Sequence, residues 1–182
     1  MENLKQLREL MAEHSLDGLV VVPGPNMTHI TKSKFHLSER PVVFFILQNE
    51  AIFILPELES PKILDLGVNY ITYDDEEGPR PAFEKFAKTN NTLRLGVESR
   101  AIRHLELDLM SSTGIASNVV DSIDMFAKLR MSKSDKEKNC MIEAVKIAET
   151  SLESVLGNIR PGVTEKQFAA DLVIELLRNG SD

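Results

Sequence analysis

The chain of 182 residues is 42% hydrophobic and 27% charged, with a formal net charge of −7, so it is too apolar for a disordered protein and large enough to bury a sizeable core. An acidic chain with no tryptophan and two tyrosines argues against nucleic acid as a partner, and its acidity argues against an anionic membrane surface. One cysteine, Cys140, excludes an internal disulfide, and no apolar run approaches the roughly 20 residues that cross a bilayer, so we expect a cytoplasmic protein without membrane contact.

In the first part of the chain, short apolar runs alternate with amphipathic segments. Apolar residues at helical spacing predict a helix over 3–15, and a β-branched run predicts a strand over 19–22. Apolar runs at 42–47 and 51–55 are separated by three polar residues, and so short a link requires antiparallel neighbours. The same patterns predict the later elements in chain order, which are helices at 59–66, 81–88 and 103–110 and strands at 69–73, 93–97 and 118–120. We therefore expect an α/β fold, a mixed and mostly parallel sheet with helices on both faces.

The last part of the chain has the pattern of two helices. Ser134-Asp135-Lys136-Glu137 has capping-box spacing, and apolar residues then recur every three or four positions as far as Ile159. Arg160-Pro161-Gly162 ends this helix, and Thr164-x-x-Gln167 begins another that ends near Gly180. Two amphipathic helices joined by a tight turn form an αα-hairpin, and each apolar seam needs a surface to pack on. We therefore expect the hairpin to belong to a domain whose sheet lies outside this chain.

The formal charge divides the chain at the same place. Residues 1–127 hold 12 basic and 19 acidic residues, a net charge of −7, whereas residues 128–182 hold nine of each. Such a change indicates two differently built regions. We expect domains over 1–127 and 128–182.

No familiar catalytic motif is present. The four histidines lack zinc-ligand spacing, and there is neither a phosphate-binding glycine loop nor a nucleophile elbow. Asp74-Asp75-Glu76-Glu77 lacks the alternating spacing of a calcium loop and is better explained as solvated loop acids. Cys140 is expected to lie in the core or at its boundary rather than to act as a nucleophile. Residue chemistry alone predicts no catalytic residue and no metal site in this chain.

Three stretches nevertheless resemble the creatinase/prolidase/aminopeptidase P superfamily. The first runs from Pro23-Gly24-Pro25-Asn26 through Thr31 and continues from Phe35 to Pro41. The second, Arg130-Met131-Ser132-Lys133-Ser134, is similar to the family's entry to its catalytic domain. The third, 159–165, is similar to its Pro-Gly-x-Thr-Glu turn. Lys32 departs from the pattern, because it stands where the family tends to have glycine.

The resemblance implies an N-terminal α/β domain at 1–127 and, at 128–182, the first two helices of a truncated "pita-bread" metallopeptidase domain. Members use two divalent metal ions, commonly Mn²⁺, Co²⁺ or Zn²⁺, held by two Asp, one His and two Glu. These ligands are expected beyond Asp182, since no histidine follows His104. The implied function is the N-terminal portion of a metal-dependent Xaa-Pro peptidase, an aminopeptidase P/prolidase-like hydrolase. We expect it to serve dimerisation and substrate access, to hold no cofactor and to be inactive alone.

The resemblance also implies a homodimer that acts on proline-containing peptides, in which the loop from Phe35 to Arg40 reaches toward a neighbour's active site in some members. We hypothesise that His36 and Arg40 bind substrate, with Arg40 holding a carboxylate end. The alternative is a solvent-exposed loop in which Glu39 and Arg40 make a weak surface contact. For the chain as a whole, the alternatives are a stand-alone dimerisation or small-ligand-binding module without catalysis, or a fragment of a creatinase-like amidinohydrolase or a lyase relative.

Overall fold

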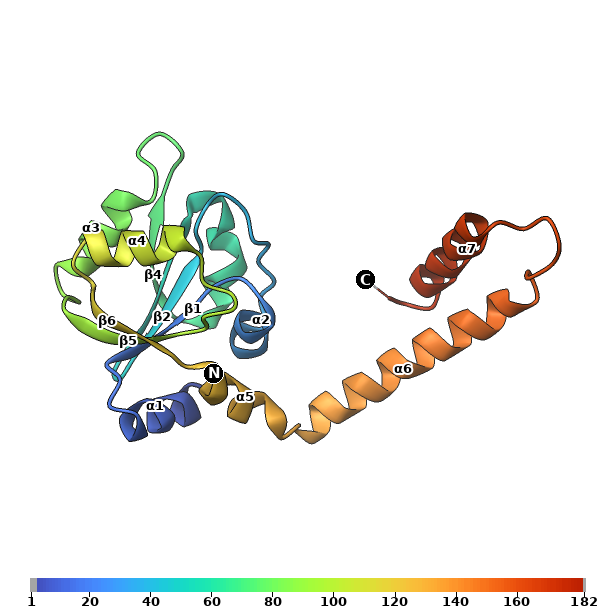
Figure 1. Cartoon of the computed structure of the whole chain (residues 1–182), viewed down its shortest axis with the longest axis horizontal. Coiled ribbons are helices and arrows are strands. Elements are labelled where there is room, and N and C mark those ends of the chain that lie inside the picture. Colours follow the sequence, from blue (N-terminus) through green and yellow to red (C-terminus); the bar gives the residue numbers. More distant parts are fainter. Residues whose placement is uncertain (1–2, 182) are drawn as a thin grey trace. The chain divides into compact units, whose positions relative to one another are not determined.

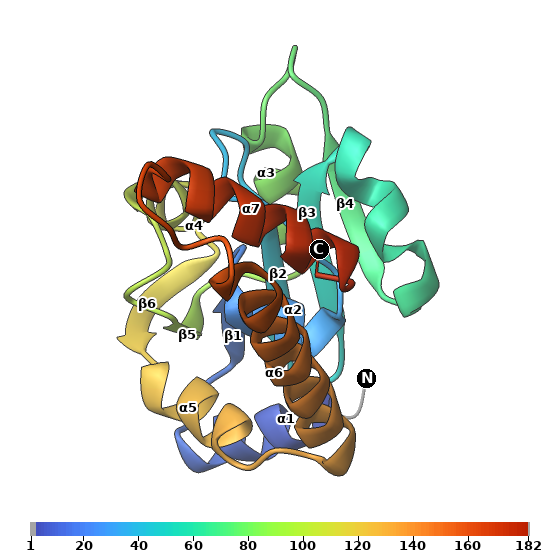
Figure 2. The ribbon, with the colours of Figure 1, turned by 90° about the vertical axis from the view of Figure 1, so that its right-hand side faces the viewer.

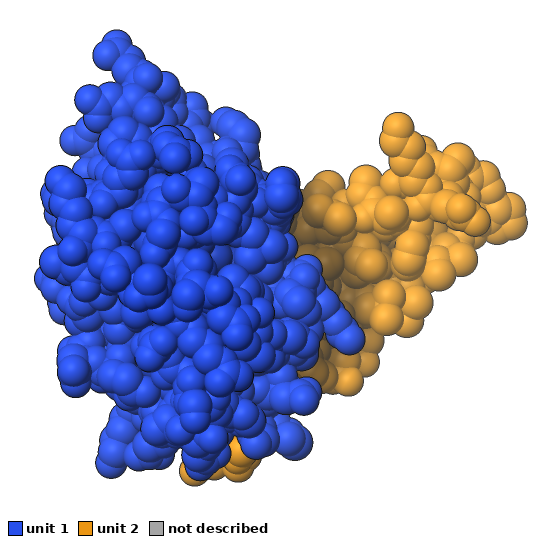
Figure 3. Space-filling model, turned by 60° about the vertical axis from the view of Figure 1, so that its left-hand side comes forward, with its two compact units in different colours: residues 1–131 blue, residues 132–182 orange. Residues whose placement is uncertain are grey.

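The computed structural model describes residues 3–181 (Figure 1). The chain divides between Met131 and Ser132 into two compact units, coloured separately in Figure 3. The sequence-based boundary after residue 127 falls inside helix α5 (Ile123–Met131). Because Met125, Phe126 and Leu129 of α5 are buried in the core of the first unit, the whole helix belongs to that unit.

Unit 1 is built on a six-stranded mixed sheet with the strand order β4-β3-β2-β1-β5-β6, which Figure 2 shows from edge to edge. The strands are β1 (Gly18–Val21), β2 (Val43–Leu47), β3 (Ala51–Pro56), β4 (Asn69–Tyr73), β5 (Leu93–Val97) and β6 (Ala116–Asp121). Strand β2 runs antiparallel to both of its neighbours, and the other three pairings are parallel. The predicted antiparallel hairpin is confirmed, with Val43 opposite Ile54 and Ile46 opposite Ala51.

Helices cover both faces of this sheet, as the apolar runs of the central strands require. Along β2, Phe44 and Ile46 join one buried cluster, whereas Val43, Phe45 and Leu47 join the other, because successive side chains of a strand point to opposite faces. The first cluster is covered by α1 (Asn3–Glu13), α2 (Pro25–Thr31), the 3₁₀ helix η1 (Glu57–Leu66) and α5. The second is covered by α3 (Arg80–Ala87) and α4 (His104–Ser112). The predicted α/β class is confirmed.

Helix α2 was not predicted, because Pro23-Gly24-Pro25 indicates a turn. Pro25 occupies the first helical turn, where its missing N–H has no intrahelical partner to lose. The helix ends at Lys32, whose φ of 62° lies in the left-handed region and whose N–H donates to the Thr28 carbonyl at 2.8 Å. A lysine therefore holds, at some conformational cost, a backbone geometry that glycine adopts freely.

Unit 2 is the predicted αα-hairpin, formed by α6 (Asp135–Leu156) and α7 (Glu165–Arg178). Both predicted capping boxes are present, with Ser134 and Thr164 as the N-cap residues. The buried hydroxyl of Ser151 accepts a hydrogen bond from Asn179 Nδ2 at 3.1 Å, which ties the end of α7 to α6. The placement predicted for Cys140 is wrong, because its side chain is exposed on α6.

No helix within residues 3–181 combines the length and apolar character needed to cross a bilayer.

Candidate functional site

The loop that carries His36 and Arg40 lies at one edge of the sheet. It leads into β2, and the start of β2 lies beside the end of β3 because the two strands are antiparallel. Strand β4 runs parallel to β3 and ends at the same edge, where residues 74–79 form the next loop. In Figure 1 this second loop, drawn in green, reaches beyond the strand ends. Residues 35–41, called the entry loop below, therefore lie within reach of the loop that follows β4.

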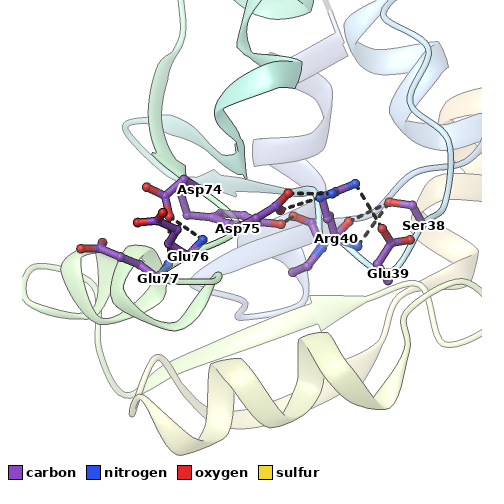
Figure 4. Close-up of polar contacts among 9 residues, drawn as sticks. Ser38, Glu39, Arg40, Asp74, Asp75, Glu76 and Glu77 are labelled. Carbon is purple, nitrogen blue, oxygen red and sulfur yellow. Dashed lines mark hydrogen bonds and ion pairs between the residues drawn. The ribbon is translucent and has the colours of Figure 1, made fainter.

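Arg40 is held by Asp75 through a two-pronged ion pair. Its Nε and Nη2 atoms each lie 2.7 Å from one carboxylate oxygen of Asp75, and Nη1 lies 3.1 Å from Glu39 (Figure 4). The Arg40 hydrogen bond holds the pKa of the Asp75 carboxyl below its usual value, and the same bond raises the pKa of Arg40. The weak Glu39–Arg40 contact considered in the alternative hypothesis is therefore present, and a stronger partner accompanies it.

The rest of the acidic loop faces away from Arg40. Figure 4 shows Asp75 pointing toward the guanidinium, whereas Asp74, Glu76 and Glu77 lie on the other side. Asp74 Oδ1 accepts hydrogen bonds from the backbone N–H groups of Glu76 and Glu77, at 3.0 and 2.9 Å. Of the four acids that the sequence assigns to solvent, Asp75 thus pairs with Arg40, and Asp74 binds the backbone of its own loop.

A buried tyrosine fixes the exit of the entry loop. The Tyr73 hydroxyl donates to the Pro41 carbonyl at 2.8 Å, and the tyrosine is only 7% exposed. Burial raises the pKa of Tyr73 above its ordinary value, because the charged form is poorly solvated there. The hydroxyl therefore stays protonated at neutral pH and keeps its donor role.

A second ion pair reaches the entry loop from α4. The Arg103 guanidinium donates from Nε to both Glu106 oxygens, at 2.9 and 3.2 Å, and from Nη2 to Oε1. Its Nη1 donates to the Ser38 carbonyl. The Glu106 side chain is fully buried, and its carboxylate also accepts the backbone N–H of Arg103 at 3.0 Å. A buried carboxylate thus aims an arginine at the backbone of the entry loop.

The start of the entry loop is anchored by packing. Phe35 is buried and lies 5.8 Å from Phe53, measured between ring centroids. Lys62 Nζ lies 5.3 Å above the Phe35 ring, and the Ser33 hydroxyl donates to the Lys62 carbonyl at 2.8 Å. Both ends of the loop are therefore fixed.

His36 lies between these anchors and is exposed, as is its neighbour Leu37, at 55%. Among the described residues, no hydrogen bond or ion pair joins His36 to Arg40. The structure thus places both candidate residues on one anchored loop without bringing their side chains into contact. Their role in substrate binding stays a prediction.

Four residues of this site were missed from the sequence: Tyr73, Asp75, Arg103 and Glu106. One signal was available, because Glu106 precedes Leu109 and Met110 by three and four positions and therefore shares their buried face. The partners of Tyr73, Asp75 and Arg103 lie 32, 35 and 65 positions away, so no local pattern marks them.

The described residues do not fit the metal pair that the resemblance implies for a full-length relative. Within residues 3–181, no three His, Cys, Asp or Glu side chains gather in a group that could hold a metal ion. Hairpin acids have other partners: Glu143 pairs with Lys146 at 2.8 Å, and Asp171 accepts from Asn158 at 3.3 Å. These acids are engaged within the hairpin itself.

Two of the three resembling stretches meet inside unit 1. Arg130, from the second stretch, donates from Nη1 to Asn26 Oδ1 of the first at 2.9 Å. Asn26 is 3% exposed and lies in the first turn of α2, whereas Arg130 lies in the last turn of α5. The contact spans 104 positions of sequence and ties the end of unit 1 to its core.

Known proteins match the chain over its length. An Xaa-Pro dipeptidase of Pyrococcus horikoshii is 24% identical over 187 residues, which is 100% of this chain and 49% of that protein. An uncharacterized peptidase of Schizosaccharomyces pombe is 26% identical over 184 residues, covering 91% of this chain and 39% of that protein. The crystal structure of the prolidase from Pyrococcus horikoshii has the same fold, with a TM-score of 0.82 at 20% identity, over 99% of this chain and 49% of that one.

The chain thus spans about half the length of the curated relatives it matches. Residues 3–132, which are more than half of the chain and contain the entry loop with all of its anchors, match the family of the creatinase/prolidase N-terminal domain. The chain belongs to the creatinase/prolidase N-terminal domain family.

Proposed function

We propose that this chain is the N-terminal portion of a metal-dependent Xaa-Pro peptidase, in which it serves dimerisation and substrate access. The observation that carries the proposal is the match to an Xaa-Pro dipeptidase over the full chain, which includes both unit 1 and the hairpin in the same order. In this proposal the N-terminal domain, which the sequence places at 1–127, continues to the end of α5, and the remainder of the predicted 128–182 segment begins the catalytic domain. The metal ions, Mn²⁺, Co²⁺ or Zn²⁺, are bound by residues outside this chain, and the chain alone is inactive.

The surface of the hairpin supports a continuation of the catalytic domain. Ser151 and Val155 are buried on α6, whereas large apolar residues of both helices are exposed. The exposed set on the helices comprises Met141, Ile142, Val145, Leu152, Leu156, Val173, Ile174 and Leu177, and Ile159 is exposed in the link between them. So many exposed apolar side chains on two helices indicate a surface that packs against further protein.

The entry loop supports a role in substrate access. It is anchored at both ends, and it presents an imidazole and a guanidinium, which suit the polar ends of a short peptide. In the proposed homodimer, His36 and Arg40 bind the peptide and take no part in bond breaking. The proposed location of the enzyme is the cytoplasm.

The reading frame and the size of the native protein test the proposal. The frame should continue past Asp182, and an antibody against unit 1 should detect a protein of about twice 20.4 kDa. That protein, purified with Mn²⁺ or Co²⁺, should cleave Xaa-Pro dipeptides, whereas the 182-residue chain should not exceed a protein-free blank. A native product of 20.4 kDa would instead favour the stand-alone module.

Substitutions in the longer polypeptide test the two binding residues. His36→Ala and Arg40→Ala should each raise KM for an Xaa-Pro dipeptide by about tenfold with kcat unchanged, as expected for lost binding contacts. Arg80→Ala is the matched control, because Arg80 also pairs with an exposed carboxylate, Glu84, at 3.1 Å. Unchanged KM in both variants would leave the loop without a binding role.

Asp75→Asn separates two roles of Arg40. If Arg40 binds the substrate carboxylate, Asp75→Asn removes its competitor and should leave KM unchanged or lower it. If Arg40 only ties the entry loop to residues 74–79, Asp75→Asn should raise KM as Arg40→Ala does. We expect the first result.

A further inference from the structure

The least expected feature of the site is the full burial of Glu106. A carboxylate without exposure is costly unless it is paired and hydrogen-bonded. Glu106 meets this requirement with one residue, since Arg103 supplies its backbone N–H, Nε and Nη2. These bonds stabilise the buried carboxylate without any further partner. The remaining contact made by Arg103 therefore has a separate role.

That remaining contact is made with the entry loop. Arg103 Nη1 donates to the Ser38 carbonyl, two residues before Arg40 and two after His36. The guanidinium is planar, so the bonds of its Nε and Nη2 atoms to Glu106 also fix the direction in which its Nη1 atom points. Arg103 is 27% exposed, which places it between the buried carboxylate and the loop surface.

We propose that Arg103 and Glu106 are positioning residues: the buried Glu106 carboxylate orients the Arg103 guanidinium, which holds the Ser38 carbonyl and so fixes where the entry loop presents His36 and Arg40. What the loop binds rests on the proposed function, whereas how the loop is held does not. Neither residue touches the peptide in this arrangement. Together with the contacts of Tyr73 and Asp75, the pair makes the loop a pre-shaped binding element.

Arg103→Met alone is a poor test, because it leaves the buried Glu106 carboxyl group without its partner and is expected to destabilise unit 1 strongly. The informative variant replaces both partners, Arg103→Met with Glu106→Leu, which keeps an apolar core and removes the donor to Ser38. Arg80→Met with Glu84→Leu is the matched control, since the hydrogen bonds of Arg80 on α3 go to Glu84 and to Ser112. Arg103→Lys keeps the charge opposite Glu106, but a single ammonium lacks the fork that serves Glu106 and Ser38 together.

The first measurement is the backbone ¹⁵N order parameter of residues 37–40 in the 182-residue chain. In the native chain and in the control we expect about 0.85, and in the double variant and Arg103→Lys we expect values below about 0.6. Order parameters of β1 and β2 should stay unchanged in all of them. A loop as ordered in the double variant as in the native chain would overturn the positioning role.

The second measurement uses the longer polypeptide that the proposed function requires. The double variant should raise KM for an Xaa-Pro dipeptide about tenfold with kcat unchanged, since a loosened loop loses binding and not chemistry. A loosened loop with unchanged KM would overturn the link between loop position and peptide binding. An inactive native polypeptide would contradict the proposed function, and the order parameters would still decide the positioning role.

Discussion

Two arginine–carboxylate pairs act on the entry loop, and their surroundings give them different roles. Arg40 and Asp75 are 38% and 64% exposed at their side chains, so solvent screens their attraction. Glu106 is fully buried, so its pairing with Arg103 decides whether unit 1 can fold around it. The exposed pair can therefore open and re-form in the folded protein, whereas the buried pair is part of the core.

The exposed pair predicts how the contact between Arg40 and Asp75 depends on pH. Asp75 has an ordinary pKa of 3.8, and its hydrogen bond with Arg40 lowers the pKa in the folded chain. A lowered carboxyl pKa contributes stability that is present above pH 3.8 and is lost as pH falls through the folded value. The Arg40–Asp75 contact should therefore persist from neutral pH to below pH 3.8, and an NMR titration of the Asp75 carboxyl carbon should show it.

Arg40→Ala is the control for this titration. Without the guanidinium, the Asp75 pKa should return toward its ordinary value. An Asp75 that titrates normally while Arg40 is present would contradict the prediction.

At the scale of elements, the sequence predicts what local patterns determine. The hairpin of β2 and β3 is predictable because three polar residues cannot support a parallel crossover. Both hairpin helices of unit 2 are predictable from their capping boxes. Helix α2 is not, because its seven residues are too few to show a helical period and its start is a proline–glycine turn.

In the candidate site too, the sequence indicates the residues that local patterns mark and not those that distant parts of the chain supply. Residue chemistry and the family resemblance direct attention to the loop with His36 and Arg40, and its Glu39–Arg40 contact is between adjacent residues. The anchors could not be predicted, since Ser38 meets Arg103 and Arg40 meets Asp75 only after the sheet brings three loops to one edge. Cys140 was misplaced because apolar neighbours on α6 suggested a buried face that the hairpin leaves open.

Strand β5 contains a glycine whose lack of a side chain is required by packing. A Cβ atom at Gly96 would lie 2.3 Å from Ser122 Oγ and 2.6 Å from Leu19 Cδ2, closer than atoms approach. We expect Gly96→Ala to lower the free energy of unfolding of unit 1 by about 1–3 kcal/mol, a typical cost of overpacking. Urea denaturation followed by circular dichroism measures it.

A second substitution tests the cause of this loss. Ser122→Ala removes the closest atom, so the double variant should recover part of the stability lost in Gly96→Ala. If the double variant loses the sum of the unfolding free energies lost in the two single variants, the Ser122 hydroxyl is not what the added Cβ atom collides with.

At the scale of the molecule, the two units differ in how well they bury their apolar residues. Unit 1 encloses two clusters on either side of its sheet, whereas α7 has no buried residue. The hairpin is held by its own contacts, such as Asn179 with Ser151. Unit 1 should therefore supply most of the free energy of unfolding, and unit 2 should supply most of the exposed apolar surface that binds other molecules.

This difference predicts where an apolar dye binds. Met141, Ile142 and Val145 line a shallow depression on α6 together with Lys146 and Glu149. Replacing two of them with opposite charges, Ile142→Glu with Val145→Lys, keeps the net charge of −7 and adds favourable pairing with Lys146 and Glu149. Dye fluorescence should fall clearly, and the free energy of unfolding of unit 1 should change by less than about 0.5 kcal/mol.

The matched control makes the same exchange on unit 1, Leu58→Glu with Leu64→Lys, at two residues of η1 that are 63% and 60% exposed. These leucines lie on a 3₁₀ helix on which Ile63 is the buried residue, so they add two exposed apolar side chains to unit 1. Dye fluorescence should change little in the control. An equal fall in both variants would mean that scattered surface leucines bind the dye as well as α6 does. The hairpin would then lack the contiguous apolar face that the proposed catalytic half is expected to cover.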